Sequence, residues 1–572
     1  FTQTDTAALA QLLEAPEEKV VTALNQAAEY SLVKRSTIVK QISQKRFSRL
    51  EEHLWRFPGL EPVMRNTRTY LNPVGANFLG YINEVDEKDL ESESSYYRLG
   101  DLIGRVGLER QYEKWLRGQK GVSLILEDVY GREIGPFAEG RYDTLPERGH
   151  DLVISIDAEL QAFAEQLMVG KKGAVVALEP ATGEILTMVS APHYDPNRLS
   201  GAAFQYTFAS LKRDTLKPLY NRAMMAMYPP GSIFKLLVGL SALEQGTLLP
   251  STRYYCYGGF ARNGGRPACH AHPTPLDLTG AIQHSCNSYF SGVYVDHLHH
   301  NRYNQFEDGF DAWHRHMDQF GIGHRTGVDL PNENPGMLPS KDYYNKIYGE
   351  GRWKGLTIVS NAIGQGEILM TPLQMAQAVS MIANRGWCIT PHFFKDFKYT
   401  PELERPRFDT NRVDIQTENF DVVINAMQQV VDGGTGWLAK IPDIAVCGKT
   451  GTSENVHGED HAVFVAFAPR DTPKIAVACI VENAGFGGVW AAPIASLVME
   501  KYLTDSIRDP WKLQRILNAN FIEGTFGVPA PATTDDDTLE VPEPTPVPEF
   551  SPVPEDMLPG EAEPLPEPEA PS

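Results

Sequence analysis

The sequence has few cysteines and no basic stripe. Six cysteines are scattered over 572 residues, too few for a disulfide framework. Residues 528–572 account for 12 of the 21 net negative charges, which leaves a net charge of −9 on the first 527 residues. These mildly acidic 527 residues contain no cluster of Lys and Arg that could bind a phosphate backbone, so no nucleic acid partner is expected.

The sequence also lacks a long apolar run. No stretch reaches the roughly 18 consecutive apolar residues that could cross a bilayer, and no charged-then-apolar signal opens the chain at Phe1. These absences predict either a soluble protein or one whose N-terminal segment was removed before this sequence begins.

Apolar residues make up 42% of the chain, and 572 residues exceed what one ordinary core requires. Two folded domains and an appendage are therefore expected. The appendage is the tail 526–572, in which acidic residues and prolines replace large apolar residues. Such a composition predicts a disordered, extended segment. A proline-rich docking ligand is the alternative.

The first 150 residues predict an elongated α+β domain. Apolar residues at helical spacing indicate helices within 7–56, and residues 62–83 and 122–154 are typical of strands. Between them, "IGRVGLERQYEKWLRGQKG" predicts a helix ended by glycine.

Residues 151–525 predict a second domain built on one antiparallel sheet. "GAVVALEPATGEILTMVSAPHYDP" is typical of a hairpin with its turn at "EPATGE". Two more runs of strand length, "AVFVAFAP" and "KIAVACIVENA", lie almost 300 residues later along the chain. Strands at both ends of a long helix-rich middle predict a sheet completed by distant segments.

The stretch "YPPGSIFKLL" places Ser232 and Lys235 three residues apart inside an apolar segment. Its two prolines and glycine predict a helix start at Ser232, so the two side chains share one helix face and their tips come close enough to hydrogen-bond. A lysine desolvated by apolar neighbours can act as the base that activates a serine. The bland alternative is a serine near a helix N-terminus and a solvent-reaching lysine.

Two further stretches supply groups that an activated serine could use. "QHSCNSYF" holds Ser285 and Asn287, and "VCGKTGTSEN" holds Lys449, Thr450, Gly451 and Thr452. Ser-x-x-Lys, Ser-x-Asn and Lys-Thr-Gly occur together, in this order, in penicillin-binding proteins and class A β-lactamases. Gly451 would let a substrate backbone lie close to a strand, beside a cationic wall rich in hydroxyl groups.

A separate loop, "CYGGFARNGGRPACHAH", gathers Cys256, Cys269, His270 and His272 within a short distance along the chain. Thiolate and imidazole ligands in that number could hold Zn²⁺. The spacing matches no standard zinc finger, so a local disulfide and free thiols stay open as alternatives.

From about residue 55 to 505 the chain resembles the class B, or monofunctional, penicillin-binding proteins. "GLERQYEKWLRGQKG" is similar to their pedestal helix, and "NRAMMAMYPPGSIFK", "NAIGQGEILMTPLQMA" and "GKTGTSEN" are similar to the stretches around their active site. Asp460 and His461 stand where division-type members usually have tryptophan, which favours the elongation type. The resemblance implies a penicillin-binding, serine β-lactamase-like transpeptidase domain with a helical subdomain.

The resemblance also implies roles for the site residues. Ser232 would attack the D-Ala-D-Ala bond of a peptidoglycan stem peptide while Lys235 takes its proton. Ser285 would bridge Lys235 and Lys449 and relay a proton to the leaving D-Ala, and Asn287 would hold the donor peptide.

In the same family pattern, Lys449, Thr450 and Thr452 would bind the terminal carboxylate, and the backbone N–H groups of Ser232 and Thr452 would form the oxyanion hole. The acyl-enzyme would pass to the amine of a second stem peptide, which makes a crosslink during cell-wall elongation. β-Lactams would leave a stalled acyl-serine. No cofactor would be required, although the family has metal sites before its Ser-x-Asn motif.

Family membership further implies a periplasmic protein, anchored to the inner membrane by an N-terminal helix that this sequence does not contain. A membrane glycosyltransferase of the elongation complex would be its partner, beside stem peptides and β-lactams. Three other functions stay open: a serine β-lactamase, a β-lactam sensor, and a scaffold that activates the glycosyltransferase.

Overall fold

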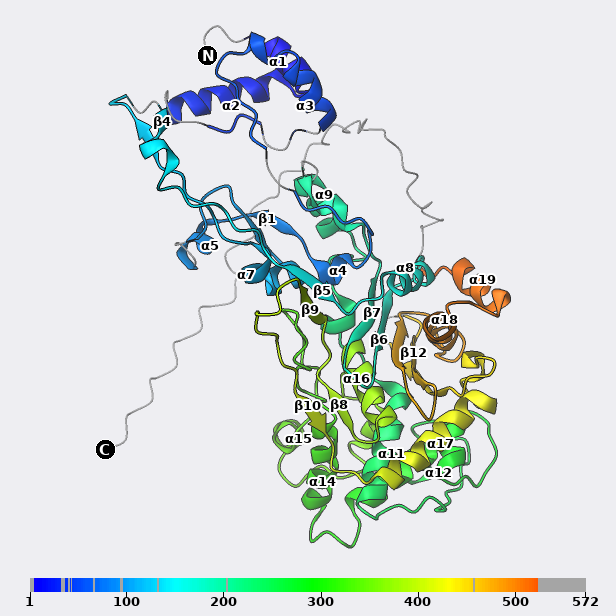
Figure 1. Cartoon of the computed structure of the whole chain (residues 1–572). Coiled ribbons are helices and arrows are strands. Elements are labelled where there is room, and N and C mark those ends of the chain that lie inside the picture. The colour runs from blue at the N-terminus through cyan, green and yellow to red at the C-terminus, as the bar shows by residue number, and fades with distance from the viewer. Residues whose placement is uncertain are drawn as a thin grey trace, which may run out of the picture. The chain divides into compact units, whose positions relative to one another are not determined.

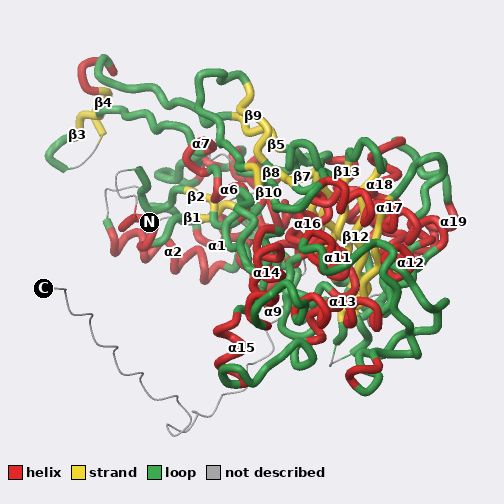
Figure 2. Tube along the Cα trace, turned by 90° about the horizontal axis from the view of Figure 1, so that it is seen from below, coloured by secondary structure: helices red, strands yellow, loops and turns green. Residues whose placement is uncertain are grey.

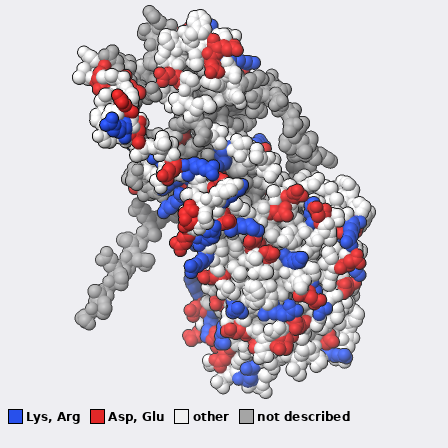
Figure 3. Space-filling view, viewed as in Figure 1, with Lys and Arg blue, Asp and Glu red and all other residues white. Residues whose placement is uncertain are grey.

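The computed structural model describes residues 5–31, 36–39, 42, 44–64, 67–92, 96–130, 133–201, 204–455 and 458–522. The tail predicted for 526–572 lies outside the described residues. None of the described helices is long and apolar enough to cross a membrane. Lys and Arg lie beside Asp and Glu over the face that Figure 3 shows.

Three helices at the N-terminus pack around a small core of their own. They are α1 (Thr6–Leu12), α2 (Glu17–Tyr30) and α3 (Gln44–Glu51). The helices predicted within 7–56 are therefore present. Their apolar faces meet at Leu9, Val20, Leu24 and Phe57, all almost fully buried.

The N-terminal domain as a whole is called the pedestal below, and the rest of it consists of short elements. They are α4 (Ala76–Leu79), β1 (Ile82–Glu84), α5 (Glu87–Ser92), β2 (Leu102–Gly104), α6 (Gly107–Gln111), α7 (Glu113–Leu116), β3 (Ile125–Glu127), β4 (Glu133–Pro136) and β5 (Asp151–Ile154). The strand-rich prediction for 62–83 is wrong except at β1, because apolar residues before it find no partner strand. The single helix predicted after residue 103 is broken at Tyr112 into α6 and α7.

A five-stranded antiparallel sheet forms the centre of the second domain, in the order β11-β12-β13-β6-β7. Its strands are β6 (Gly173–Leu178), β7 (Ile185–Ala191), β11 (Cys447–Ser453), β12 (His461–Ala468) and β13 (Ile475–Val481). Both the predicted hairpin and the predicted completion of the sheet by distant segments are confirmed. Pairing of β6 with β13 joins the two ends of the domain. In Figure 1 the teal strands β6 and β7 and the golden strand β12 lie in the same part of the molecule.

Helices cover both faces of this sheet. One face packs against α8 (Ala158–Leu167), α18 (Ala491–Thr504) and α19 (Pro510–Asn518). The other face packs against α10 (Arg222–Met225), α11 (Lys235–Glu244), α16 (Pro372–Ala383) and α17 (Thr417–Gly433). In Figure 2 the yellow strands β12 and β13 lie among the red helices α11, α16 and α18.

A helical subdomain continues from the second layer. Its helices are α12 (Leu278–Gln283), α13 (Asn287–Leu298), α14 (Phe306–Gln319) and α15 (Lys341–Tyr348). Three short strands and one further α-helix complete the strands and α-helices described in this domain: β8 (Trp387–Ile389), β9 (Phe394–Lys398), β10 (Thr410–Arg412) and α9 (Phe204–Arg213). Together with the sheet, this arrangement confirms the predicted α+β architecture, in which an antiparallel sheet carries a helical subdomain.

The pedestal is tied to the second domain by strand pairing and buried hydrogen bonds. Strand β5, at the end of the pedestal, pairs with β9. Asp329 accepts hydrogen bonds from the Tyr112 hydroxyl at 2.6 Å and from the backbone N–H groups of Phe393 and Phe394. Glu165 accepts one from the Gly75 N–H at 2.7 Å. These contacts anchor the pedestal's short elements to a large core.

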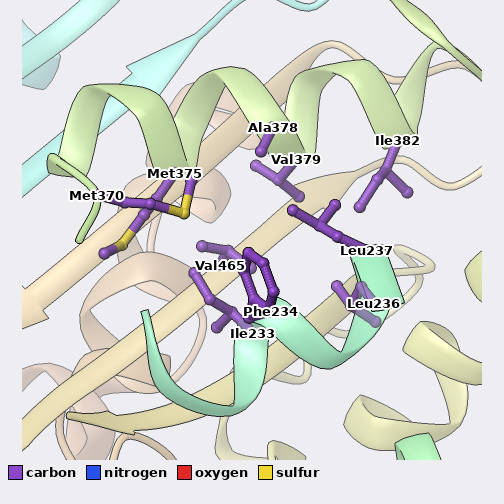
Figure 4. Close-up of a pocket in the computed structure, with 10 residues that line it drawn as sticks. All are labelled: Ile233, Phe234, Leu236, Leu237, Met370, Met375, Ala378, Val379, Ile382 and Val465. Carbon is purple, nitrogen blue, oxygen red and sulfur yellow. The ribbon is translucent and has the colours of Figure 1, made fainter. Parts of the chain in front are cut away.

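A small apolar cavity lies beneath the segment that carries Ser232. Figure 4 shows Ile233, Phe234 and Leu237 facing Met375 and Val379 of α16, with no polar side chain among the labelled residues. A cavity of this composition has no group that could orient a peptide, so it belongs to the packing of the core.

Candidate active site

Ser232 lies where a 3₁₀ turn, η5 (Gly231–Phe234), runs directly into α11. Pro230 precedes the turn, and Gly231 adopts a φ of +59°, a conformation that favours glycine. Apolar contacts of Ile233 and Phe234 with the core hold the turn, while Ser232 remains half-buried. The predicted helix start is therefore confirmed.

Lys235 is completely buried on the first turn of α11. Its ammonium donates hydrogen bonds to the Ser285 carbonyl at 2.7 Å, the Ser285 hydroxyl at 3.2 Å and the Asn287 side-chain oxygen at 2.6 Å. Among the hydrogen bonds between described residues, none joins Lys235 to Ser232, although the sequence predicts that their tips lie within reach. Catalytic hydrogen bonds are often formed only when substrate is bound.

Ser285 occupies the sharp turn between α12 and α13, in the left-handed region at a φ of +54°. This conformation is rare for a residue with a side chain and is a typical form of strain at functional sites. Cys286 caps α13 by accepting a hydrogen bond from the Tyr289 N–H. Ser285 and Asn287 thus lie at a polar turn between two helices, α12 and α13, that are mostly buried.

The Ser285 hydroxyl connects two buried lysines. Lys449, completely buried on β11, donates to Ser285 Oγ at 2.9 Å and to the Thr450 carbonyl at 3.0 Å. Lys235 donates to the same hydroxyl from the other side. The Ser-x-x-Lys, Ser-x-Asn and Lys-Thr-Gly stretches, far apart along the chain, thus meet at one oxygen atom.

Burial changes the titration of both lysines. Desolvation lowers the pKa of Lys235 to about 8, because burial disfavours the ammonium form. Desolvation lowers the pKa of Lys449 well below its usual value, and the neighbouring Lys235 lowers it further. The lowered pKa of Lys235 makes the free amine, which a general base requires, more abundant near neutral pH than it is for an exposed lysine.

Strand β11 is the edge strand next to Ser232. The Thr450 hydroxyl shares a hydrogen bond of 2.7 Å with the Thr435 hydroxyl. The Thr452 carbonyl accepts a hydrogen bond of 2.9 Å from the Gln365 side-chain amide. A Cβ on Gly451 would lie 3.1 Å from the Pro230 carbonyl, so the glycine permits close approach of the two segments.

Four possible metal ligands cluster beside this network. One ligand atom from each residue lies within 4.8 Å of the others, and the residues are Cys256, Cys269, His272 and Cys286. Hydrogen bonding from Cys286 lowers the pKa of the Cys269 thiol below its ordinary value. His270 is exposed and is not part of the cluster.

The metal-ligand cluster contacts the Ser-x-Asn stretch directly. The Asn287 N–H donates to Cys269 Sγ at 3.3 Å, and the Asn287 side-chain amide donates to the Ala268 carbonyl at 2.6 Å. Asn287 in turn accepts from Lys235. The Cys/His loop thus helps to set the position of the residue that holds the buried lysine.

Comparison with known proteins agrees with this geometry. Residues 173–500 match the family of the penicillin binding protein transpeptidase domain, and residues 2–154 match the penicillin-binding protein dimerisation domain. The chain belongs to the penicillin-binding protein transpeptidases. The family predicted from the sequence motifs is confirmed.

Individual relatives of this penicillin-binding protein are named as peptidoglycan D,D-transpeptidases or as PBP2. The peptidoglycan D,D-transpeptidase MrdA of Acinetobacter baumannii is 31% identical over 528 residues, which cover 88% of this chain and 76% of the relative. The crystal structure of Pseudomonas aeruginosa PBP2 in complex with WCK 5153 is 32% identical, with a TM-score of 0.62, and covers 78% of this chain and 93% of that one.

A chain of a peptidoglycan synthase complex, described for its coordination of polymerization and crosslinking, is 27% identical. Its TM-score is 0.68, and the match covers 82% of this penicillin-binding protein and 81% of that chain.

Sequence reasoning missed three residues that contact the predicted site. Cys286 is the middle residue of the Ser-x-Asn motif, and a cysteine at this position, close to a Cys/His loop, is a signal that the sequence does offer. Gln365 lies in the stretch "NAIGQGEILMTPLQMA", which resembles the family, but the sequence assigns it no role. Nothing in the local sequence distinguishes Thr435, because its contact with Thr450 depends on the fold.

Proposed function

We propose that this chain is a serine D,D-transpeptidase that crosslinks peptidoglycan stem peptides during cell-wall elongation. The observation that carries the proposal is the hydrogen-bond network beside Ser232, in which Lys235 and Lys449 both donate to the Ser285 hydroxyl and Lys235 also donates to Asn287. Relatives named as peptidoglycan D,D-transpeptidases support the substrate class.

In this proposal Ser232 Oγ attacks the carbonyl carbon of the penultimate D-Ala, and the neutral amine of Lys235 takes its proton. The backbone N–H groups of Ser232 and Thr452 hold the developing oxyanion. Collapse of the tetrahedral intermediate breaks the peptide bond, and the Ser285 hydroxyl passes a proton to the leaving D-Ala nitrogen. Lys449 and Ser285 share that hydrogen-bonded path.

The substrate's terminal carboxylate would bind along β11, beside Lys449 and the hydroxyl groups of Thr450 and Thr452. Asn287 would hold the donor peptide together with Lys235. An amine of a second stem peptide then attacks the acyl-serine carbonyl, which forms the crosslink and frees Ser232. A β-lactam would acylate Ser232 in the same way, but its opened ring remains attached and blocks the second step.

Intact-mass spectrometry after addition of a penicillin tests this function. We expect one adduct per chain that lasts for many minutes, and no adduct on Ser232→Ala or Lys235→Ala. An adduct that clears within seconds would instead indicate a β-lactamase, and its absence from the folded parent would indicate a scaffold. A persistent adduct without transfer to a stem-peptide amine would indicate a sensor.

The proposal includes a division of the chain into a pedestal (1–150), a transpeptidase domain (151–525) and an acidic tail (526–572). The matched family ranges 2–154 and 173–500 support a first boundary within a few residues of 150, although β5 (Asp151–Ile154) still lies in the matched dimerisation domain. Limited proteolysis should cut near residues 150 and 525 before it cuts the sheet.

We further propose a location in the periplasm at the inner membrane and a membrane glycosyltransferase as partner. Stem peptides are crosslinked outside that membrane, and the relative from a peptidoglycan synthase complex supports coupling to polymerisation. The membrane anchor belongs to this proposal, since no described helix supplies it. Cell fractionation and co-purification with the glycosyltransferase test both parts.

We also propose that the cluster of Cys256, Cys269, His272 and Cys286 holds a structural Zn²⁺, while the reaction itself needs no cofactor. Three thiolates and one imidazole are a donor set that suits tetrahedral Zn²⁺. The lowered pKa of Cys269 favours the thiolate that a metal requires.

Metal analysis by mass spectrometry of the purified protein tests the zinc site. One Zn²⁺ per chain is expected in the parent and in Cys388→Ser, which removes a buried cysteine outside the cluster. Cys269→Ser should lose the metal. Absence of Zn²⁺ from both the parent and Cys388→Ser would contradict the site. Equal amounts of Zn²⁺ in Cys388→Ser and Cys269→Ser would also contradict it.

A further inference from the structure

The end of β11 presents its backbone to the segment that carries Ser232. In an antiparallel strand the N–H and C=O of one residue point to the same side. The Thr452 carbonyl points toward Gln365 rather than toward β12, so the Thr452 N–H points to the open edge as well. Strand pairing therefore satisfies neither group of Thr452.

Residues 364 and 365 reach both sides of this junction. The Gly364 carbonyl accepts a hydrogen bond of 2.8 Å from the Gly231 N–H, immediately before Ser232. The adjacent Gln365 donates its side-chain amide to the Thr452 carbonyl at 2.9 Å. Two consecutive residues thus hold the two segments whose backbone N–H groups must point at one oxyanion.

The packing around these bonds leaves little room for adjustment. A Cβ on Gly231 would clash with the Thr452 carbonyl, and a Cβ on Gly364 would clash with the Gly231 carbonyl. Gln365 itself is buried, with an exposed fraction of 8%. The Gln365 side-chain amide is the side-chain donor that hydrogen-bonds to the Thr452 carbonyl.

We infer that Gln365 is a positioning residue for the oxyanion hole. Its amide fixes the end of β11 relative to the Ser232 turn, so that the N–H groups of Thr452 and Ser232 converge on the oxygen that becomes negative during acylation. The inference rests on the proposed function. Misplacement of a preorganised donor by about 1 Å can reduce a rate by about 100-fold, whereas it hardly changes ground-state binding.

A purely structural role makes a different prediction. Gln374 is also buried, and its amide also donates to backbone carbonyls, of His324 and Pro335, each at 2.7 Å. Those carbonyls lie in the loop after α14, and none of the contacts of Gln374 involves β11 or the Ser232 turn. Gln374→Met is therefore the matched control for the loss of a buried amide.

The experiment measures acylation by a penicillin in the parent, Gln365→Met, Gln365→Glu and Gln374→Met. Stopped-flow kinetics separate the dissociation constant of the noncovalent complex from the acylation rate constant, and thermal unfolding is recorded for each protein. Affinity for a boronic acid, which forms a tetrahedral adduct with the serine, reports on the oxyanion hole independently.

We expect both Gln365 variants to lower the acylation rate constant by about 10- to 100-fold, with the dissociation constant within about twofold of the parent. Boronate affinity should fall by a similar factor. Gln374→Met should lower the melting temperature without changing the acylation rate constant. If Gln365→Met does not fold, Gln365→Glu decides, because it keeps the shape of the side chain.

An acylation rate constant in the Gln365 variants equal to that of the parent would overturn the inference. The inference would also be overturned if Gln374→Met lost as much boronate affinity and acylation rate as the Gln365 variants. Failure of the parent itself to be acylated at Ser232 would instead remove the proposed function, so the two failures are distinguishable.

Discussion

The central sheet of the transpeptidase domain and the β3–β4 hairpin of the pedestal differ completely in burial. Every residue of β6, β7 and β13 is buried, whereas every residue of β3 is exposed. The sheet is covered by helices on both faces, and the hairpin has no such cover among the described residues. This difference indicates that stability and catalytic geometry come from the sheet, and that the hairpin contributes little to either.

The largest stability effect is expected in the sheet. Phe467 of β12 is fully buried in the main core, so Phe467→Ala should lower the free energy of unfolding by about 3–5 kcal/mol. Urea denaturation with fluorescence detection measures it. A loss of less than about 1 kcal/mol would show that the sheet is not the stabilising centre.

The next effect lies where the pedestal that carries the hairpin meets the domain that carries the sheet. Asp329→Ala removes the acceptor of the Phe393 and Phe394 N–H groups and of the Tyr112 hydroxyl. Buried donors without partners destabilise, and we expect a loss of about 3 kcal/mol. Tyr112→Phe, which removes only the pedestal's bond, is the matched variant and should lose about 1 kcal/mol. Equal losses of stability in Asp329→Ala and Tyr112→Phe would show that the hydrogen bond from the Tyr112 hydroxyl accounts for the whole effect.

A smaller effect concerns the pH dependence of acylation. Because burial lowers the pKa of Lys235 to about 8, the reactive amine becomes more abundant above that pH. The acylation rate constant should rise about tenfold between about pH 7 and 9. Stopped-flow acylation over this range measures the midpoint, which belongs to the coupled pair of Lys235 and Lys449.

The control for this assignment is Lys171, another buried lysine with a pKa of about 8, which donates to carbonyls at the C-terminal end of α19. Lys171→Met should leave the midpoint unchanged, and a shifted midpoint would contradict the assignment to Lys235. Lys235 also affects stability. The unfolded state binds more protons between about pH 8 and 10.5, so the Lys235 contribution to stability rises with pH across that window.

The same contrast explains what the sequence could predict. Continuous apolar runs such as "AVFVAFAP" indicate buried strands without knowledge of their partners, and the three motifs carry their own chemistry. The pedestal offers weaker signals, since residues 62–75 contain apolar residues that find no partner strand, and one predicted helix breaks at Tyr112.

Within the site, the sequence indicated the residues that carry reactive groups and missed those that position them. Gln365 and Thr435 act on β11 through contacts across 87 and 15 residues of chain, and neither contact leaves a local pattern. Cys286 was missed because the Ser-x-Asn motif assigns roles to Ser285 and Asn287 and none to the residue between them.

The smallest effect should come from the hairpin. Ile134 on β4 is 69% exposed, so Ile134→Ala removes little apolar surface from contact with the protein, and the free energy of unfolding should change by less than about 0.5 kcal/mol. The acylation rate constant should not change, because the hairpin shares no contact with the Ser232 network among the described residues. Denaturation and penicillin acylation of this variant measure both. A loss near that of Phe467→Ala would mean that the hairpin's apolar side chains are covered in solution, and the contrast between the two regions would fail.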